Sequence, residues 1–431
     1  MKHRWFVIIL SATLYLNLFA EAPAAPARWK QNQFLVTFWC APPATDEALT
    51  RVAAEGFNLT WTPPEGLDVA ARHHLRAMLQ SPLLDPGVLD NPAKRAELEA
   101  LIARVKNHPA LEAYHLTDEP GAGAFPAWGR LVAFLRERDP QHLAYINLFP
   151  TYANEQQLGV SASSADRARV GYPTDFAGVD TSDKTVLRYR EHLKQFVAVV
   201  DPDLISYDHY HFLKNDKGAH DGKQYFLNLG LIRLAAQEAE KPFLNIIQAN
   251  TIEKSWRLPN ADELRWLVFT TLAYGGRGIS YFTYWGPPAY NGLYQDGQPA
   301  PLLQPVVKLN QELARFGPAL MQLESLGVYH TAPLPYGGEA LRNPGSVQIA
   351  SRGEFVVGVF GTNGRASAFM IVNRNYREPQ KAVVRVLIPG RKLQELDRQT
   401  GEWSAGKSLN RRRIVDMKLT PGDGRLFRLV D

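Results

Sequence analysis

Two adjacent carboxyl groups end an apolar segment in the stretch AYHLTDEPGAG, residues 113–123. Asp118 and Glu119 close the segment, and Pro120 stops a strand from continuing because proline has no N–H to donate. Burial at such a position raises the pKa of a carboxyl group, so that it stays protonated near neutral pH and acts as a general acid. Glu119 is therefore predicted to be a proton donor.

Asp118 lies one residue before Glu119, and successive side chains of a strand point to opposite faces. We therefore expect Asp118 to turn away from Glu119 and to fix a loop or the backbone at the edge of the binding site. The alternative is structural: Asp118 caps a helix that begins near Pro120, and Glu119 stands in its first turn, where the helix dipole favours anions.

A second carboxylate is predicted in ISYDHY, residues 205–210, where Asp208 stands near the end of an apolar segment. A proton donor and a second carboxylate are the pair that hydrolysis of a glycosidic bond needs. A salt bridge inside the fold is the alternative for Asp208, and Glu253 in a later loop is a weaker rival. His209 and His211 have no third ligand at metal-binding spacing, so no metal site is predicted.

Polar and aromatic residues also end the other apolar segments. Such side chains bind sugars through hydrogen bonds and ring stacking. An aromatic wall is predicted from Trp39, Tyr284 and Trp285, and further substrate contacts from Asp118, Asn147, Tyr207, His209, Tyr210, Gln248 and Asn250. Aromatic residues make up 11% of the chain, which agrees with a sugar site and equally with a large aromatic core.

The elements that must position these residues alternate regularly between residues 34 and 285. Short apolar strands are predicted at 34–39, 57–62, 75–80, 111–120, 143–150, 204–210, 243–250 and 279–285, with amphipathic helices between them. This order is typical of a (β/α)8 TIM barrel, whose functional residues lie at the carboxyl ends of the strands. A doubly wound open sheet is the alternative, but no glycine-rich phosphate loop follows the first strand.

After about residue 325 the helical periodicity gives way to short strands separated by Gly, Asn and Pro turns, which predicts a small antiparallel β-sandwich. The predicted organisation is a signal peptide at 1–27, a (β/α)8-barrel catalytic domain at 28–324 and a β-sandwich domain at 325–431.

The first 27 residues have the pattern of an export signal. Lys2 and Arg4 precede an apolar run from Trp5 to Ala20, and the small residues AEAPAAPA follow. At about 16 residues the run is short for a membrane span, and an uncleaved anchor is the alternative. The mature protein is expected to be secreted or periplasmic, with no membrane contact after cleavage.

Net charge and cysteine count bear on which partners and cross-links we expect. A formal charge of +5 is weak evidence for a nucleic-acid partner, and none is predicted. Cys40 is the only cysteine, so no intrachain disulfide can form, and a buried apolar role is expected for it.

At the residues described, the chain resembles the clan A (β/α)8-barrel glycoside hydrolases, including β-galactosidase-like families with a β-sandwich after the barrel. The motifs are HLTDEP, YFTYW and LTPGDGRLFRL. The resemblance implies that Glu119 is the acid/base residue and that Trp285 stacks on the sugar. Two features depart from the clan: Asp118 replaces the usual Asn before the acid, and Gln248 or Asn250 stands where the strand-seven nucleophile Glu is expected.

Three functions remain open at this point. In the first, the protein is a secreted glycoside hydrolase with Glu119 as the acid and Asp208 as base or nucleophile. In the second, hydrolysis is assisted by the N-acetyl group of the substrate, because SYDHY is similar to the Tyr–Asp pair of chitinase-like barrels. In the third, the barrel binds carbohydrate without hydrolysing it. No cofactor is implied by any of them.

Overall fold

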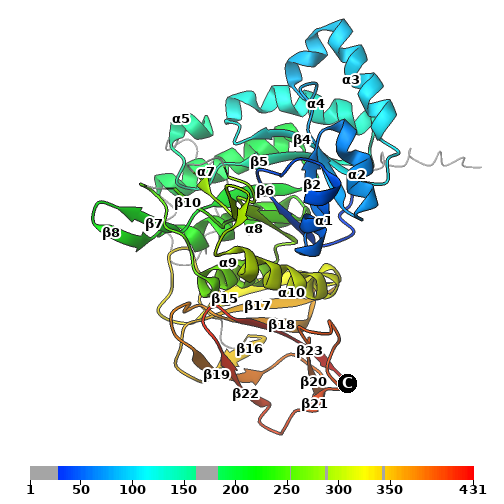
Figure 1. The fold of residues 1–431 in the computed structure, drawn as a ribbon. Helices are drawn as coiled ribbons and strands as arrows, with labels where there is room; N and C mark the ends of the chain where they lie inside the picture. Colours follow the sequence, from blue (N-terminus) through cyan, green and yellow to red (C-terminus); the bar gives the residue numbers. More distant parts are fainter. Residues whose placement is uncertain (1–27, 162–182, 253, 287–289, 342–344) are drawn as a thin grey trace, which may run out of the picture.

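The computed structural model describes residues 28–161, 183–252, 254–286, 290–341 and 345–431. The predicted signal peptide, Glu253 and most of the loop at 159–183 lie outside the described residues. Figure 1 shows a barrel in the first two thirds of the chain, with a smaller domain of antiparallel strands beneath it.

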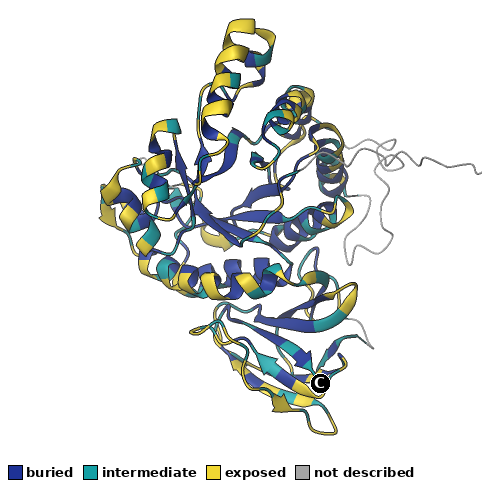
Figure 2. Cartoon of the chain, turned by 90° about the vertical axis from the view of Figure 1, so that its right-hand side faces the viewer, coloured by how far each residue is buried: buried dark blue, intermediate teal, exposed yellow. Residues whose placement is uncertain are grey.

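Eight parallel strands form the barrel and confirm the predicted TIM-barrel fold. Their order in the sheet is β1-β11-β9-β6-β5-β4-β3-β2, so each chain neighbour is also a spatial neighbour once the added hairpins are set aside. They are buried along almost their whole length, as strands covered by helices must be (Figure 2). Their bounds are β1 Leu35–Phe38, β2 Leu59–Thr62, β3 Arg76–Leu79, β4 Leu111–Asp118, β5 Leu143–Leu148, β6 Ile205–His209, β9 Phe243–Gln248 and β11 Gly278–Phe282.

The seam between β1 and β2 is closed by a side chain, because these two strands are not paired in the hydrogen-bonded sheet. Asn58 accepts from the backbone N–H of Val36 at 2.8 Å and donates to the carbonyl of Phe34 at 2.7 Å. Its amide thus supplies the donor and the acceptor that a neighbouring strand would supply.

Helices cover the outside of the barrel, and their starts follow the capping rules. Asn91 caps α3 just before Pro92, and Asn260 forms a capping box with Glu263 at the start of α9. The longer helices are α1 Asp46–Ala54, α2 Leu67–Arg72, α3 Pro92–Val105, α4 Phe125–Arg138, α7 Lys184–Gln195, α8 Tyr225–Glu238, α9 Ala261–Ala273 and α10 Leu303–Met321.

Shorter elements decorate the loops. A hairpin of β7 and β8 follows β6, and β10 pairs with β12 after β9. Their bounds are β7 Phe212–Asn215, β8 Gly218–Asp221, β10 Thr251–Ile252, β12 Tyr290–Asn291, β13 Tyr294–Gln295 and β14 Gln298–Pro299; the short helical segments are η1 Pro64–Gly66, η2 Pro86–Asp90, η3 Ala122–Ala124, α5 Glu155–Leu158 and η4 Phe196–Val200.

The C-terminal domain consists of two antiparallel sheets, as the sequence predicted. The larger sheet has the order β15-β17-β18-β23-β20-β21 and the smaller one β16-β19-β22. The strands are β15 Glu324–His330, β16 Val347–Ile349, β17 Phe355–Thr362, β18 Arg365–Asn373, β19 Gln380–Val386, β20 Lys392–Glu395, β21 Lys407–Ser408, β22 Ile414–Leu419 and β23 Gly424–Val430.

The larger C-terminal sheet packs directly on the barrel. One face of β17 and β18 joins the barrel residues in a single apolar cluster that includes Trp266, Phe360 and Met370. Gly422 lies so close to α9 that an added Cβ would stand 2.4 Å from the carbonyl oxygen of Asp262. The two domains therefore share a core, with α9 and α10 as the layer between them (Figure 1).

Within the described residues, we find no helix with the length and apolar character needed to cross a bilayer.

Candidate active site

A cavity of about 340 Å³ opens at the carboxyl ends of the barrel strands, the end where TIM barrels carry their functional residues. Three carboxyl groups and an amide stand on one side of it, and aromatic rings form much of the rest. The lining residues are Trp39, Asp118, Glu119, Asn147, Phe149, Pro150, Tyr152, Ala153, Gln157, Asp208, Tyr210, Ile246, Ile252, Trp256, Phe282 and Tyr290.

Asp118 and Glu119 both face this cavity, which corrects the expectation that Asp118 turns away. A register shift between His115 and Thr117 disturbs the pairing of β4 with β5, and Glu119 then adopts a left-handed backbone with φ of 47°. These two irregularities break the alternation of a regular strand, so neighbouring residues share one face.

The alternative of a helix cap does not apply to Asp118. The following turn, η3, has Gly121 at its N-cap position, with no side-chain hydrogen bond. The backbone N–H of Glu119 donates instead to the carbonyl of Asn147 at 2.9 Å. A left-handed non-glycine residue costs about 1–2 kcal/mol, and such strain concentrates at functional sites.

Asn147 links the carboxylates through a single amide. Its Nδ2 donates to Oδ1 of Asp118 at 3.0 Å and to Oδ1 of Asp208 at 3.1 Å, so both of its hydrogens are used. Its Oδ1 accepts from Ser206 at 3.1 Å, and the Ser206 hydroxyl is 2.8 Å from that of Tyr145. The amide orientation is thereby fixed, and it favours the ionised forms of Asp118 and Asp208 as acceptors.

The carboxyl groups of Glu119 and Asp208 are close enough to change each other's pKa, and a proton bound to one of them favours the ionised form of the other. Burial raises the pKa of both groups, and the negative charge of Asp208 raises that of Glu119 further. Because Asn147 already donates to Asp208, the shared proton resides on Glu119. This is the protonation state that a general acid needs near neutral pH.

Asp118 adds a second negative charge to the cavity, next to the one that the Glu119–Asp208 pair carries. Its side chain is open to solvent at the mouth, but the surrounding protein still raises its pKa by desolvation, against the hydrogen bond from Asn147. The described lining residues include no Lys, Arg or His. The cavity is therefore strongly electronegative and suits a ligand that develops positive charge.

The aromatic wall differs from the predicted one, although Trp39 belongs to it. Trp256 and Tyr210 lie with ring centroids 4.0 Å apart, and Phe282 stands 5.5 Å from Tyr210. Tyr152 also lines the cavity and is 45% exposed. Of these rings, the sequence analysis named Trp39 and Tyr210.

Trp256, Phe282, Tyr152 and Tyr290 were missed for identifiable reasons. Phe282 is the last residue of β11, so counting from the true strand end would have found it. Trp256, Tyr152 and Tyr290 are in or beside loops, where no periodicity indicates which way a side chain points.

Two predicted contacts on β6 face away from the cavity. Tyr207 is fully buried in the core around the barrel. His209 places Nδ1 2.9 Å from Oδ1 of Asn228 on α8, and burial lowers its pKa to about 4, so it is neutral. Strand alternation is the physical reason, because Asp208 and Tyr210 take the inward positions.

The predicted contacts after β9 and β11 are likewise absent from the lining. The side-chain amide of Gln248 is hydrogen-bonded to the backbone of Phe212 and Arg257. Asn250 is fully buried. Tyr284 packs on Phe38 at 4.5 Å, and Trp285 stacks on Tyr294 at 6.1 Å. Gln248 ends β9, and the other three residues lie beyond the ends of β9 and β11.

Metal binding finds no support in the described part of the chain, where no group of three or more His, Cys, Asp or Glu side chains could hold an ion. Cys40, beside Trp39, is partly buried, and desolvation raises the pKa of its thiol. A protonated thiol is a poor nucleophile.

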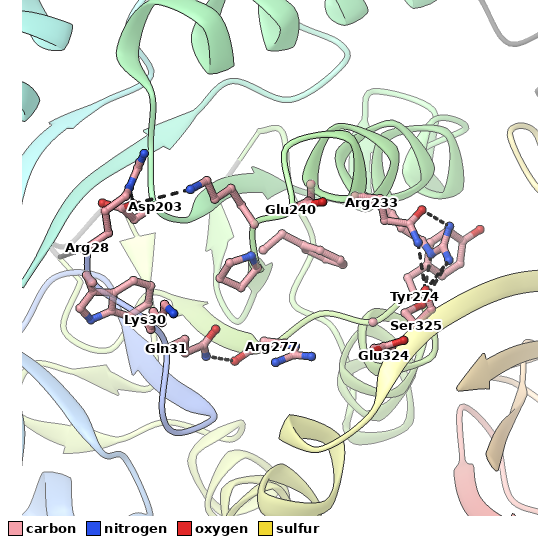
Figure 3. A pocket seen from close by; sticks show the side chains of 17 residues that line it. Arg28, Lys30, Gln31, Asp203, Arg233, Glu240, Tyr274, Arg277, Glu324 and Ser325 are labelled. Atoms are coloured by element: carbon pink, nitrogen blue, oxygen red, sulfur yellow. Dashed lines mark hydrogen bonds and ion pairs between the residues drawn. The ribbon is translucent and has the colours of Figure 1, made fainter. Parts of the chain in front are cut away.

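A second cavity of about 530 Å³ lies at the opposite end of the barrel, against the C-terminal domain (Figure 3). Arg277 donates to the carbonyls of Met321 and Leu323, and Arg233 donates to the carbonyl and hydroxyl of Ser325. Met321 is the last residue of α10, Leu323 lies in the link that follows, and Ser325 belongs to β15. The basic side chains here clamp the two domains together, which agrees with the stabilising role of this face in TIM barrels.

No family model matches the sequence, and the comparison with curated proteins finds no relative. The fold is similar to that of solved (β/α)8-barrel glycoside hydrolases. A family 39 glycoside hydrolase from Bacteroides cellulosilyticus WH2 has a TM-score of 0.49 at 11% identity, over 92% of this chain and 80% of that one.

Two further structures extend this comparison. Endo-glycoceramidase II from Rhodococcus sp. has a TM-score of 0.39 at 14% identity, over 94% and 100% of the two chains. A β-galactosidase from Marinomonas ef1 has a TM-score of 0.35 at 14% identity, over 65% and 59%. At this identity the likeness concerns the fold, and the chemistry must be derived from the site itself.

Proposed function

We propose that this protein is a glycoside hydrolase in which Glu119 is the general acid and Asp208 its partner carboxylate. The observation that carries the proposal is that Glu119 and Asp208 line one aromatic-walled cavity at the carboxyl ends of the strands, where burial and their mutual charge raise the pKa of Glu119. Glycosidic bonds are cleaved by a carboxylic acid with a raised pKa next to an ionised carboxylate.

Glu119 transfers its proton to the glycosidic oxygen as the C–O bond to the anomeric carbon breaks, and the leaving sugar departs as an alcohol. Positive charge develops on the ring that remains, where the carboxylates of Asp208 and Asp118 stabilise it. Water supplies the hydroxyl that completes hydrolysis, and its proton restores Glu119.

Asp208 serves this step first as the group that keeps the proton on Glu119. In the usual two-carboxylate mechanisms the groups stand about 5–5.5 Å or about 6.5–9.5 Å apart, leaving room for the sugar or for a water. Before substrate binds, Asp208 and Glu119 act on each other directly, which is consistent with the raised pKa of both carboxyl groups.

The same contact favours a second candidate, hydrolysis assisted by the substrate. If Asp208 stays beside Glu119, a neighbouring group on the sugar, such as an N-acetyl oxygen, can attack the anomeric carbon in place of a protein nucleophile. Gln248 does not compete for that role, because its amide is bound to the backbone of Phe212 and Arg257. The third candidate is a barrel that binds carbohydrate without cleaving it.

The test is Glu119→Gln, assayed on a panel of aryl glycosides, with and without a 2-acetamido group, and on polysaccharides. We expect turnover to fall by about 10²–10⁴, the usual contribution of a general acid, while sugar binding persists. Glu112→Gln is the matched control, since Glu112 is a buried acid on the same strand that accepts from Trp29 at the other end of the barrel.

Each outcome selects one reading. Activity within tenfold of wild type in Glu119→Gln rules out the acid role. Hydrolysis confined to 2-acetamido glycosides identifies the assisted mechanism. Binding without release of reducing ends by the wild-type protein leaves the non-catalytic barrel.

Export is a further part of the proposal and is supported by the sequence of the first 27 residues. An extracellular or periplasmic location would give the site access to polymeric carbohydrate. Intact-mass measurement of the secreted protein should find a chain that starts between residues 23 and 28.

A further inference from the structure

Trp256 forms part of the cavity wall, yet it belongs to a loop whose support comes from the C-terminal domain. We propose that the β-sandwich domain positions this wall through the Asp221 cluster, which we define as Asp221, Arg257, Tyr376 and Arg377. The inference rests on the proposed function only where it predicts an effect on substrate binding.

The loop that carries Trp256 is tied to β7. The backbone N–H of Arg257 donates to the carbonyl of Phe212, and Lys214 donates to that of Ser255 at 2.9 Å. Gln248 completes the tie, because its side chain accepts from Phe212 N–H and donates to the carbonyls of Phe212 and Arg257, each at 2.9 Å. Trp256 therefore cannot shift without moving β7.

Arg257 extends this tie away from the cavity. Its guanidinium makes two 2.7 Å hydrogen bonds to Glu263 at the start of α9 and one of 3.3 Å to Asp221 at the end of β8. It also lies over the ring of Phe212, 4.6 Å from the centroid. The residue next to Trp256 is thus anchored at two points, a barrel helix and the hairpin.

Asp221, in the hairpin of β7 and β8, accepts hydrogen bonds from two residues of the C-terminal domain. The Tyr376 hydroxyl donates to its Oδ2 at 2.5 Å, and Arg377 donates to the same oxygen at 2.9 Å. The Tyr376 ring also packs on Phe212 at 5.6 Å and on Trp266 at 5.2 Å. Both residues lie in the connection between β18 and β19, so they are part of the C-terminal domain.

The sandwich can serve as an anchor because it is itself fixed to the barrel. Arg233 and Arg277 clamp the interdomain link in the cavity of Figure 3, about the far end of the barrel. The apolar cluster shared by Trp266 and Met370 spans the interface between these points. Tyr376 is therefore a positioning residue on a rigid support, and it acts on the wall through Asp221.

Tyr376→Phe in the full chain tests this directly. The peptide that contains Trp256 and Arg257 should exchange its amide hydrogens about tenfold faster, because one charge-assisted hydrogen bond to its support is lost. Tyr336→Phe is the matched control: the Tyr336 hydroxyl also donates at 2.5 Å to a barrel carboxylate, that of Asp183, and neither residue lines the cavity. That control should leave exchange near Trp256 unchanged.

A kinetic measurement adds the functional consequence. On an aryl glycoside that the wild-type protein hydrolyses, Tyr376→Phe should raise KM about fivefold and change kcat less than twofold, as expected when uniform substrate binding is weakened. Asp221→Asn should act in the same direction.

Three results would overturn the inference. The first is unchanged amide exchange near Trp256 in folded Tyr376→Phe and Asp221→Asn. The others are an equal effect from Tyr336→Phe, or a loss in kcat without a change in KM. If the wild-type protein hydrolyses no glycoside, the proposed function fails, and the exchange measurement alone decides the positioning.

Discussion

Asn147 sets the charge state of the site, because one amide donates to two carboxylates and leaves the third as the proton carrier. Removing either hydrogen bond should therefore redistribute the proton. In the proposed mechanism Asn147 thus helps to keep the proton on Glu119, although Asn147 does not itself transfer that proton. Sequence alone indicates an amide near the carboxylates, but not that both of its hydrogens are used.

The pH dependence of activity follows from the neighbours of Glu119. In the proposed mechanism protonated Glu119 is the active form, which is fully present below its pKa and is lost as the pH rises through that value. The charge of Asp118 contributes to raising this pKa, after burial and Asp208. Asp118→Asn should therefore lower the pKa of Glu119 and move the alkaline limb of the kcat/KM profile to lower pH.

The control for this shift is Asp90→Asn, which removes an exposed carboxylate paired with Arg130 on the outside of the barrel. Its profile should coincide with that of the wild type. An alkaline limb that stays in place, or moves to higher pH, in Asp118→Asn would contradict the assignment of that limb to Glu119.

Strand alternation explains how far the site residues could be predicted. Asp208 and Tyr210 were found because they end a regular strand, but the same segment also gave Tyr207 and His209, which the pleat turns outward. Asp118 lines the cavity with the other predicted contacts, but its expected direction was wrong, since the register shift in β4 and the left-handed Glu119 bring it to the same side as Glu119. Such irregularities depend on tertiary pairing, which the local sequence does not encode.

At the scale of elements, Asn58 closes the barrel where β1 and β2 lack a continuous ladder. Asn58→Ala leaves the N–H of Val36 and the carbonyl of Phe34 without this partner. Unsatisfied buried polar groups cost about 1–3 kcal/mol each, so we expect a loss of about 2–4 kcal/mol in the free energy of unfolding, measured by urea denaturation.

Asn32→Ala is the comparison for this variant, because Asn32 is an exposed asparagine near the same strand. Its effect should stay within about 0.5 kcal/mol. Equal stability of the Asn58 and Asn32 variants would mean that water or a shifted backbone replaces the Asn58 amide.

The strands themselves were predictable because apolar runs between helices have few other solutions. Predicted strands at 143–150, 243–250 and 279–285 overran the observed ends at Leu148, Gln248 and Phe282. Most of the extra residues are apolar or aromatic like the strand, so the sequence alone does not show where the strand stops. That overrun is what misplaced Asn250, Tyr284 and Trp285.

At the scale of the whole molecule, the C-terminal domain completes the fold of the barrel. The outer face of α9 contacts β17, β18 and β23, and an added Cβ at Gly424 would stand 2.5 Å from the ring of Phe269. The sequence predicted two antiparallel sheets after the barrel but did not predict that they pack on it. The interface residues are apolar, and the sequence does not distinguish them from the core residues of either domain.

A chain that ends at residue 323 should therefore fail to fold on its own. It would expose the apolar faces of α9 and α10 that the sheet now covers, and contiguous apolar patches of that kind cause aggregation. We expect an insoluble product, scored by the soluble fraction and by thermal melting next to the full chain. A soluble fragment with a cooperative melt would show that the barrel is independent.

The left-handed backbone at Glu119 has a consequence for the directed evolution of more heat-resistant variants of this protein. Glycine relieves the torsional strain at that position and also removes a buried acid, so selection on heat tolerance alone rewards its arrival. If Glu119 is the proposed acid, a library screened without a catalytic readout would favour variants that have lost it, and the most stable variants would be inactive.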